Sequence, residues 1–162
     1  MSTPQLPFEA YAPASDPVHG GKESLSRFIT YFETLSPSSL ADIARIYAPN
    51  ACFRDPFNNV QGLDAVRRVF VHMFAVTEAP RFVVLDALGN AAQGFVVWNF
   101  NFRGKGRSAR NWVIHGATRL EFDAQGLVTL HRDYWDAAGE LYAHLPMLGP
   151  LLRAVKKRLQ AD

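Results

Sequence analysis

The stretch "RLEFDAQGLVTLHRDYWD", residues 119–136, contains two runs rich in β-branched and aromatic residues around an Asp-Ala-Gln-Gly turn. Such runs predict two antiparallel strands joined by a hairpin. Because successive side chains of a strand point to opposite faces, His131, Asp133 and Trp135 share one face of the second strand, and Arg132 lies on the other. Both faces of this strand therefore carry ionisable side chains, and one of them must face the core.

Two more runs of the same kind precede this hairpin, at residues 81–90 and 94–104, so that four antiparallel strands are predicted in all. In the middle two strands the even-numbered residues form the apolar set and are the predicted core face: Val96, Trp98, Phe100 and Phe102 in one, and Trp112, Ile114, Gly116, Thr118, Leu120 and Phe122 in the next. Alternation leaves the last strand undecided, because Val128 and Leu130 alternate with His131 instead of sharing its face.

Helical periodicity dominates the chain before residue 80. Residues 23–35, 36–47 and 63–76 each place apolar side chains at the spacing of a helix, and the serines that open the second segment suit a helix cap. Helices first and a meander of strands last predict an α+β domain in which the helices pack on one face of a curved sheet.

The two ends of the chain differ from this central part. Residues 1–22 carry four prolines and a Gly-Gly pair without any period, which predicts an extended or mobile arm, and the domain is expected to span residues 23–140. Residues 141–162 predict an amphipathic helical tail that packs over the sheet or against a partner subunit, with no stable membrane association. Its apolar and basic side chains oppose one another: Leu148, Leu151, Leu152, Val155 and Leu159 against Arg153, Lys156, Lys157 and Arg158.

Composition narrows the class of protein. A chain of 162 residues with 48% hydrophobic residues is long enough for one domain around a single core. Seventeen basic against fifteen acidic side chains are too evenly balanced to predict a nucleic-acid partner. The single cysteine, Cys52, has no disulfide partner and no neighbouring metal-ligand spacing, so neither a metal site nor an oxidising compartment is expected. Without a signal peptide or a membrane-spanning run, the predicted location is cytoplasmic.

Two motifs resemble a known family. The run "IARIYAPNACFRDPF", residues 43–57, is similar to the Tyr-Ala and Glu-Asp-Pro-Phe run of ketosteroid isomerase, and residues 119–136 resemble its Phe-Asp, Gly and Tyr-Trp run. Over residues 24–140 the order of elements resembles the nuclear transport factor 2-like superfamily, which also includes the SnoaL-like polyketide cyclases. The resemblance implies a cone-shaped, curved antiparallel sheet (a cystatin-like α+β roll) with N-terminal helices over its concave face, one internal cavity and a C-terminal helix.

The same resemblance suggests site residues. Asp55 stands where the isomerases keep a proton-shuttling aspartate, and Tyr31 where they keep a hydrogen-bond-donating tyrosine. Thr118 replaces their second donor, a carboxylic acid, and this departure argues against steroid isomerisation. The resemblance also places His131, Asp133 and Trp135 on the pocket wall, and the further substrate-binding candidates are Trp98, Trp112 and Phe53.

An imidazole and a carboxylate in one cavity can exchange protons with a substrate near neutral pH, without a cofactor. We therefore expect a small-molecule pocket protein, a cofactor-independent isomerase, lyase or cyclase that acts on a small apolar substrate containing oxygen. Asp133 and His131 would be its acid/base pair, assisted by Asp55. Three alternatives stay open: Asp55 as a turn residue, the His131–Asp133 pair as a polar contact that fixes strand register, and a non-catalytic ligand-binding or protein-interaction module.

Alternation also suggests a partner. Four apolar side chains fall on the convex side of the predicted sheet, where a monomer would expose them: Val97, Val113, Leu130 and Tyr134. We therefore expect a homodimer through this outer face.

Overall fold

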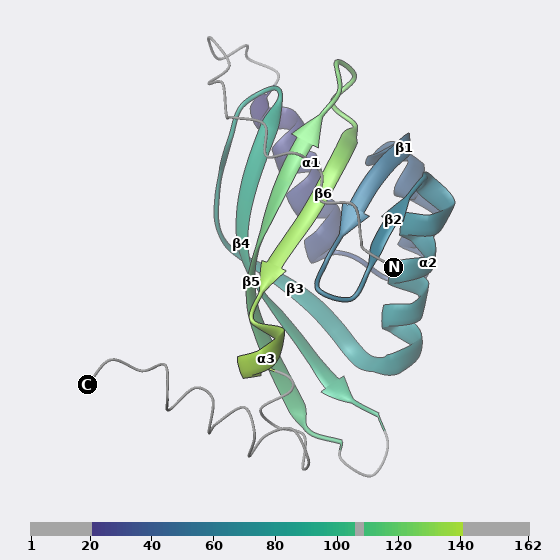
Figure 1. The fold of residues 1–162 in the computed structure, drawn as a ribbon, viewed down its shortest axis with the longest axis vertical. Helices are drawn as coiled ribbons and strands as arrows, with labels where there is room; N and C mark the ends of the chain where they lie inside the picture. Colours follow the sequence, from purple (N-terminus) through teal and green to yellow (C-terminus); the bar gives the residue numbers. More distant parts are fainter. Residues whose placement is uncertain (1–20, 106–108, 141–162) are drawn as a thin grey trace, which may run out of the picture.

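The computed structural model describes residues 21–105 and 109–140. Its helices and strands follow the chain in this order: α1 (Gly21–Glu33), the 3-10 helix η1 (Ser39–Arg45), β1 (Tyr47–Arg54), β2 (Asn59–Gln61), α2 (Leu63–Val76), β3 (Thr77–Gly89), β4 (Gln93–Gly104), β5 (Asn111–Phe122), β6 (Val128–Trp135) and α3 (Ala137–Glu140). The predicted α+β class, with helices first and a meander of four strands last, is confirmed (Figure 1).

The strands form one six-stranded sheet in the order β2-β1-β6-β5-β4-β3. Neighbouring strands are antiparallel except β1 and β6, which pair in parallel. This pairing joins the two halves of the chain, because β1 belongs to the helical half and β6 ends the meander. Residues 47 and 131, which lie 84 positions apart in the sequence, meet here.

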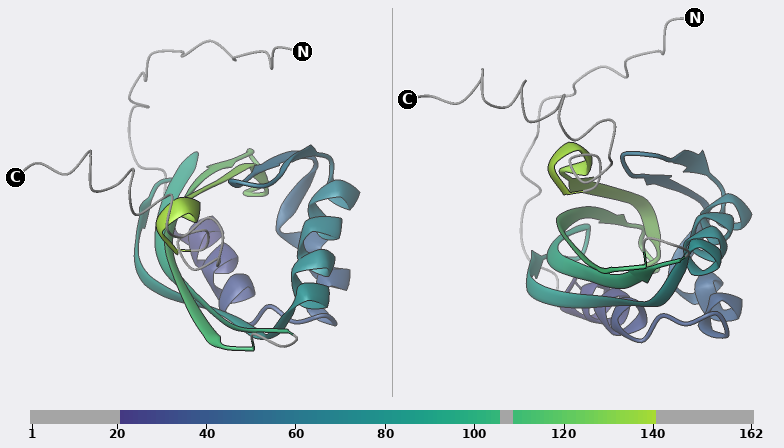
Figure 2. Two further views of the ribbon diagram at one scale, coloured as in Figure 1. Left: turned by 60° about the horizontal axis from the view of Figure 1, so that its bottom comes forward. Right: turned by 90° about the horizontal axis from the view of Figure 1, so that it is seen from below.

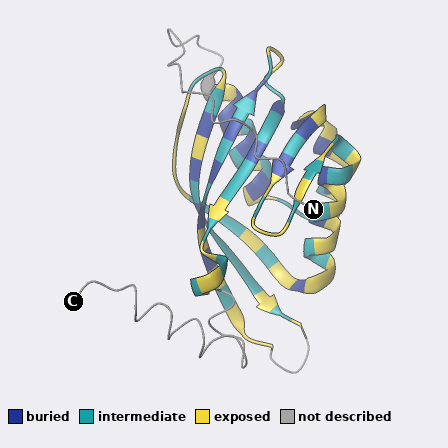
Figure 3. Cartoon of the chain, in the orientation of Figure 1, coloured by how far each residue is buried: buried dark blue, intermediate teal, exposed yellow. Residues whose placement is uncertain are grey.

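The sheet curls around an interior that the helices close. Figure 2 shows α1 against the concave face and α2 across the interior from the meander. The core is rich in aromatic side chains from α1, α2 and the concave strands, such as Phe28, Phe32, Phe53, Phe70 and Trp98. Figure 3 shows that buried positions gather toward one end of the meander, while the other end is more open.

The predicted facing of β4 and β5 is confirmed. The even-numbered residues Val96, Trp98, Ile114, Thr118 and Leu120 are all buried. Of the four residues of the predicted convex patch, Val113 is 59% exposed and Tyr134 is 46% exposed, whereas Val97 and Leu130 are half-buried.

β6 turns His131 toward the interior, and a bulge explains why alternation could not show this. Leu120 pairs with His131 and Glu121 with Leu130, but Phe122 pairs with Val128, so that Thr129 is an extra residue in β6. An inserted residue reverses the alternation of the strand. Val128 and His131 are therefore both buried, although their positions differ by an odd number.

Some predicted boundaries were wrong. The second predicted helix, residues 36–47, is a 3-10 helix that ends at Arg45, and Tyr47 instead begins β1. α1 starts at Gly21, inside the predicted arm, and β3 starts at Thr77, directly after α2. The predicted arm up to residue 20 and the predicted tail 141–162 lie outside the described residues, which end with α3 at Glu140.

Gly116 lets β5 and the Trp98 indole approach closely. A methyl group at this position would lie 2.5 Å from the Trp98 ring. We expect Gly116→Ala to lower the free energy of unfolding by about 1–3 kcal/mol, because the indole must leave its place in the core. Urea denaturation measures this change. The control is Gly104→Ala, whose methyl group would meet Trp112 at 3.2 Å, and a loss there as large as that of Gly116→Ala would contradict the explanation.

Candidate functional site

His131 lies at the centre of the core, with 2% of its surface exposed. Aromatic rings from α1 and β1 surround its imidazole, with Phe53 at 4.7 Å and Phe28 at 5.5 Å between ring centroids. A polar ring in such a place is tolerated only if its nitrogens are hydrogen-bonded. Nδ1 lies 2.6 Å from the Tyr47 hydroxyl, and Nε2 lies 2.8 Å from Oδ1 of Asp133. Both nitrogens are therefore satisfied.

A second set of hydrogen bonds reaches Asp133 from the other side. The indole Nε1–H of Trp98 donates to Oγ1 of Thr118 over 2.8 Å, and the Thr118 hydroxyl donates to Oδ1 of Asp133 over 2.5 Å. Two donors, from His131 and from Thr118, thus converge on the same carboxylate oxygen. Oδ2 makes no hydrogen bond within the described residues, and 15% of the Asp133 side chain is exposed.

The position of the protons on Tyr47 and His131 can be derived from the Tyr47 hydroxyl. Burial raises the pKa of Tyr47 well above its usual value, and the negative charge of Asp133 raises it further, so Tyr47 keeps its proton. The hydroxyl proton needs an acceptor, and Nδ1 of His131 is the partner it has. Nδ1 is then unprotonated, and Nε2–H is the donor to Asp133.

Asp133 borders a cavity of about 470 Å³ at the open end of the sheet. This volume lies within the range of small-molecule sites. The wall is mostly apolar and aromatic, with contributions from β1, α2 and the meander that include Phe53, Phe70, Phe82, Trp98, Phe100, Phe102, Ile114 and Trp135. Deeper inside, a void of about 20 Å³ adjoins Thr118, His131 and Asp133, which is about the room of one water molecule.

Asp55 also lines this cavity, but its carboxylate is engaged by its own loop. Oδ1 accepts hydrogen bonds from the backbone N–H groups of Phe57 and Asn58 at 2.7 and 2.5 Å, and Oδ2 accepts one from the Asn58 side chain at 2.9 Å. This is the geometry of a turn stabilised by an aspartate side chain. Asp55 and Asp133 thus line the same cavity, but the oxygens of Asp55 are already hydrogen-bonded to Phe57 and Asn58.

Two other predicted residues lie away from the cavity. The Tyr31 hydroxyl donates to the backbone oxygen of Ser39 over 3.0 Å, and burial raises the pKa of Tyr31 to about 12. Trp112 stacks on Phe102 and carries the Arg110 guanidinium 3.6 Å from its ring centre. Neither residue is part of the cavity wall described above. Among the predicted binding residues, Thr118, Trp135, Trp98 and Phe53 do reach the cavity or the void behind it.

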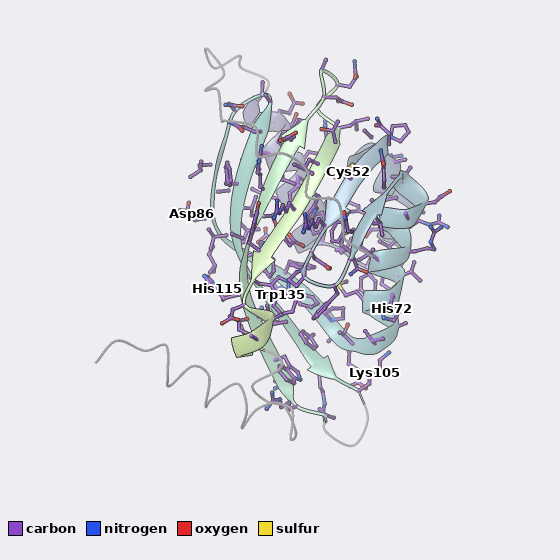
Figure 4. The ribbon with its side chains drawn as sticks, in the orientation of Figure 1. Cys52, His72, Asp86, Lys105, His115 and Trp135 are labelled. Atoms are coloured by element: carbon purple, nitrogen blue, oxygen red, sulfur yellow. The ribbon has the colours of Figure 1, made fainter. Side chains whose placement is uncertain are left out.

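Two polar residues of this region were not predicted from the sequence. Tyr47, which orients His131, was assigned to a helix, and only its pairing with a distant strand brings it to the site. His72 lines the cavity from α2, and Figure 4 labels it on that helix, with Trp135 near the end of β6. Its position on the polar side of the helical period gave no signal of a role.

The described part of the chain shows neither a candidate metal site nor a candidate membrane-spanning helix. It contains no group of three or more His, Cys, Asp or Glu side chains that could hold a metal ion. None of the helices within residues 21–105 and 109–140 is long and apolar enough to cross a membrane.

A family model described as a SnoaL-like domain matches residues 28–131, which include the Tyr47–His131 contact. The chain belongs to the SnoaL-like family. A comparison with curated proteins gives no match.

Solved structures share the fold of this SnoaL-like protein. One is a proposed SnoaL-like polyketide cyclase from Jannaschia sp. CCS1, with 12% identity, a TM-score of 0.66, and coverage of 78% of this chain and 94% of that one. Another, from Shewanella putrefaciens CN-32, has 15% identity, a TM-score of 0.62, and coverage of 82% and 97%. A protein from Catenulispora acidiphila with a ketosteroid isomerase-like fold, in complex with trimethylamine, has 15% identity, a TM-score of 0.62, and coverage of 74% and 89%. At these identities the likeness establishes the fold alone.

The Tyr47 hydroxyl can be removed without a change in ring volume. We expect Tyr47→Phe to lower the free energy of unfolding of this SnoaL-like protein by about 1–3 kcal/mol, because Nδ1 of His131 stays buried without a partner. Denaturant titration followed by tryptophan fluorescence measures the loss. Tyr31→Phe is the control, since it removes a hydroxyl whose acceptor is less buried. An equal or larger loss in the control would argue against the special role of Tyr47.

Proposed function

We propose that this protein binds a small, largely apolar molecule containing oxygen and moves a proton on it through Asp133, as a cofactor-independent isomerase, lyase or cyclase. One observation carries the proposal. The hydrogen bonds that start from Tyr47 and Trp98 meet on Oδ1 of Asp133 and leave Oδ2 without a hydrogen bond among the described residues, and Asp133 lines an apolar cavity of about 470 Å³. Such a cavity with converging ionisable groups is the usual form of a catalytic pocket.

The chemical step is proton abstraction next to a carbonyl group. Oδ2 of Asp133 takes the proton, the carbon–hydrogen bond breaks, and its electron pair forms an enolate on the substrate. Return of the proton to another carbon is an isomerisation, loss of a β-substituent is a lyase reaction, and attack of the enolate on an internal carbonyl is a cyclisation. His131 and Thr118 hold the carboxylate through Oδ1 and thereby orient Oδ2.

The enolate oxygen needs a hydrogen-bond donor. Tyr31 and Thr118, the donors suggested by the resemblance, are turned to Ser39 and Asp133 instead. Trp135 lines the cavity beside Asp133, and its indole N–H makes no hydrogen bond within the described residues. We assign Trp135 as the donor to the substrate oxygen.

A non-catalytic ligand-binding module is the second candidate. The observation in its favour is that no buried side-chain nitrogen or oxygen of the described residues lacks a hydrogen-bond partner. A fully satisfied network can serve to fix the pairing of β1 and β6 without any reaction.

We further propose a homodimer through the outer face of the sheet, in a cytoplasmic protein. Support comes from apolar side chains exposed on that face, among them Phe95, Val113 and Tyr134. Light scattering at micromolar concentration is expected to give twice the mass of one chain, and Val113→Arg to shift it toward the monomer. A monomer mass for the unmodified protein would overturn this part of the proposal.

The catalytic proposal can be tested without the natural substrate. In D₂O, the protein should speed the exchange of the α-protons of 2-tetralone, an apolar bicyclic ketone, as followed by proton NMR. Asp133→Asn is expected to reduce the exchange by about 100-fold or more, to the level of buffer, because an amide cannot accept the proton.

Asp42→Asn is the matched control, since Asp42 lies on the surface in an ion pair with Arg45. It should exchange protons as fast as the unmodified protein. Binding of 2-tetralone without faster exchange in the unmodified protein would favour the non-catalytic module. Equal exchange by Asp133→Asn, with its fold verified by circular dichroism, would exclude Asp133 as the base.

A further inference from the structure

A second hollow lies beside the candidate site, where β1 and β6 separate. The two strands pair in parallel as far as Arg54 and Arg132, after which the chain turns away through Asp55 and Pro56. Between the diverging strands lies a groove of about 580 Å³. Its wall is more polar than that of the cavity and consists of Arg54, Asp55, Pro56, Arg132, Asp133, Tyr134 and Trp135.

Arg54 and Arg132 stand side by side on one face. They are register partners in the parallel pair, and their neighbours Phe53 and His131 point inward, so both arginine side chains start from the outer face. Arg119 continues the row on β5, opposite Arg132. Like charges placed directly opposite one another on a sheet destabilise it. Negative charge placed near such a row reduces this repulsion.

Neither Arg54 nor Arg132 has an ion pair within the described residues, whereas Arg119 is paired with Glu121 at 2.6 Å. The groove wall also contains two carboxylates. Asp55 is hydrogen-bonded to its own loop, and Asp133 is hydrogen-bonded to His131 and Thr118. The groove thus holds two guanidinium groups that no described carboxylate pairs with directly.

One of these groups also contacts an aromatic ring. The guanidinium carbon of Arg132 lies 4.8 Å from the centre of the Tyr134 ring, within the range of a cation–π contact. A planar guanidinium presents its N–H groups in a fork that matches the oxygens of a carboxylate or phosphate. The groove is therefore suited to an oxyanion.

We propose that the groove is an oxyanion subsite for the substrate of the neighbouring cavity. Asp55, Asp133 and Trp135 belong to the walls of both hollows, so one molecule can occupy the two. The ligand class is an apolar body that bears a carboxylate or a phosphate group. This inference rests on the proposed function for the position of the apolar body, and it adds the charged group that orients it toward Asp133.

Binding of three probes tests the proposal by titration calorimetry: 2-naphthol, 2-naphthoate and 2-naphthyl phosphate. The two anions are expected to bind about tenfold or more tightly than the neutral naphthol, and Arg54→Gln with Arg132→Gln is expected to remove that advantage while naphthol binding is unchanged. The advantage should also shrink as salt is raised, because the subsite is partly exposed. A preference between the two anions tells whether the natural group is a carboxylate or a phosphate.

Arg119→Gln is the matched control, an arginine of the same row that is paired with Glu121 and is not part of the groove wall. Its binding of the anions should equal that of the unmodified protein. Light scattering checks that no variant changes mass, since Arg132 lies on the face proposed to dimerise. Equal binding of all three probes, weaker binding of the anions, or an anion preference that survives the double substitution would overturn the subsite. Asp133-dependent proton exchange would stand or fall separately from these results.

Discussion

A buried imidazole is the constraint on which this structure depends. His131 has almost no contact with solvent, and each of its ring nitrogens needs a partner that comes from elsewhere in the chain. Tyr47 of β1 satisfies one and Asp133 of β6 the other, and the line of hydrogen bonds continues to Thr118 of β5 and Trp98 of β4. These four strands are neighbours in the sheet, so the polar chain crosses it from strand to strand. The only parallel pairing of the described sheet, between β1 and β6, is the one that the Tyr47–His131 contact spans.

The same arrangement bears on the stability of the protein and on the proposed proton transfer. A carboxylate beside an apolar cavity is costly to bury, and the two donors on Oδ1 offset part of that cost. Because His131 and Thr118 both donate to Oδ1 of Asp133, they orient the carboxylate and leave Oδ2 without a hydrogen bond among the described residues. Asp55 shows the opposite outcome, since its loop uses both of its oxygens. Of two acids that line one cavity, the geometry favours Asp133 as the reactive group.

Much of the fold could be predicted from the sequence. α2 has the limits that its period indicated, residues 63–76, and the even-numbered face of β4 and β5 is buried. The orientation of β6 could not be derived from alternation, since a bulge at Thr129 reverses it. Tyr47 was assigned to a helix because its spacing from Leu40 and Ile43 fits a helical period, and nothing local reveals a strand that pairs 84 positions away. The resemblance placed Asp133 on the cavity side, but it could not show how Tyr31 and Thr118 are hydrogen-bonded.

The parallel pairing of β1 with β6 also bears on the order in which the molecule is completed. β1 emerges early in synthesis and stays without β6, one of its two neighbours, until the last strand of the meander is made. Contacts between such distant segments form slowly, because the chain loses the entropy of closing a long loop before the contacts stabilise it. Until β6 is in place, Tyr47 lacks its hydrogen-bond partner His131, and the cavity lacks the part of its wall that Asp133 and Trp135 form. A chain able to hold its ligand is therefore one whose final strand is already in place, so occupancy of the cavity reports a finished fold.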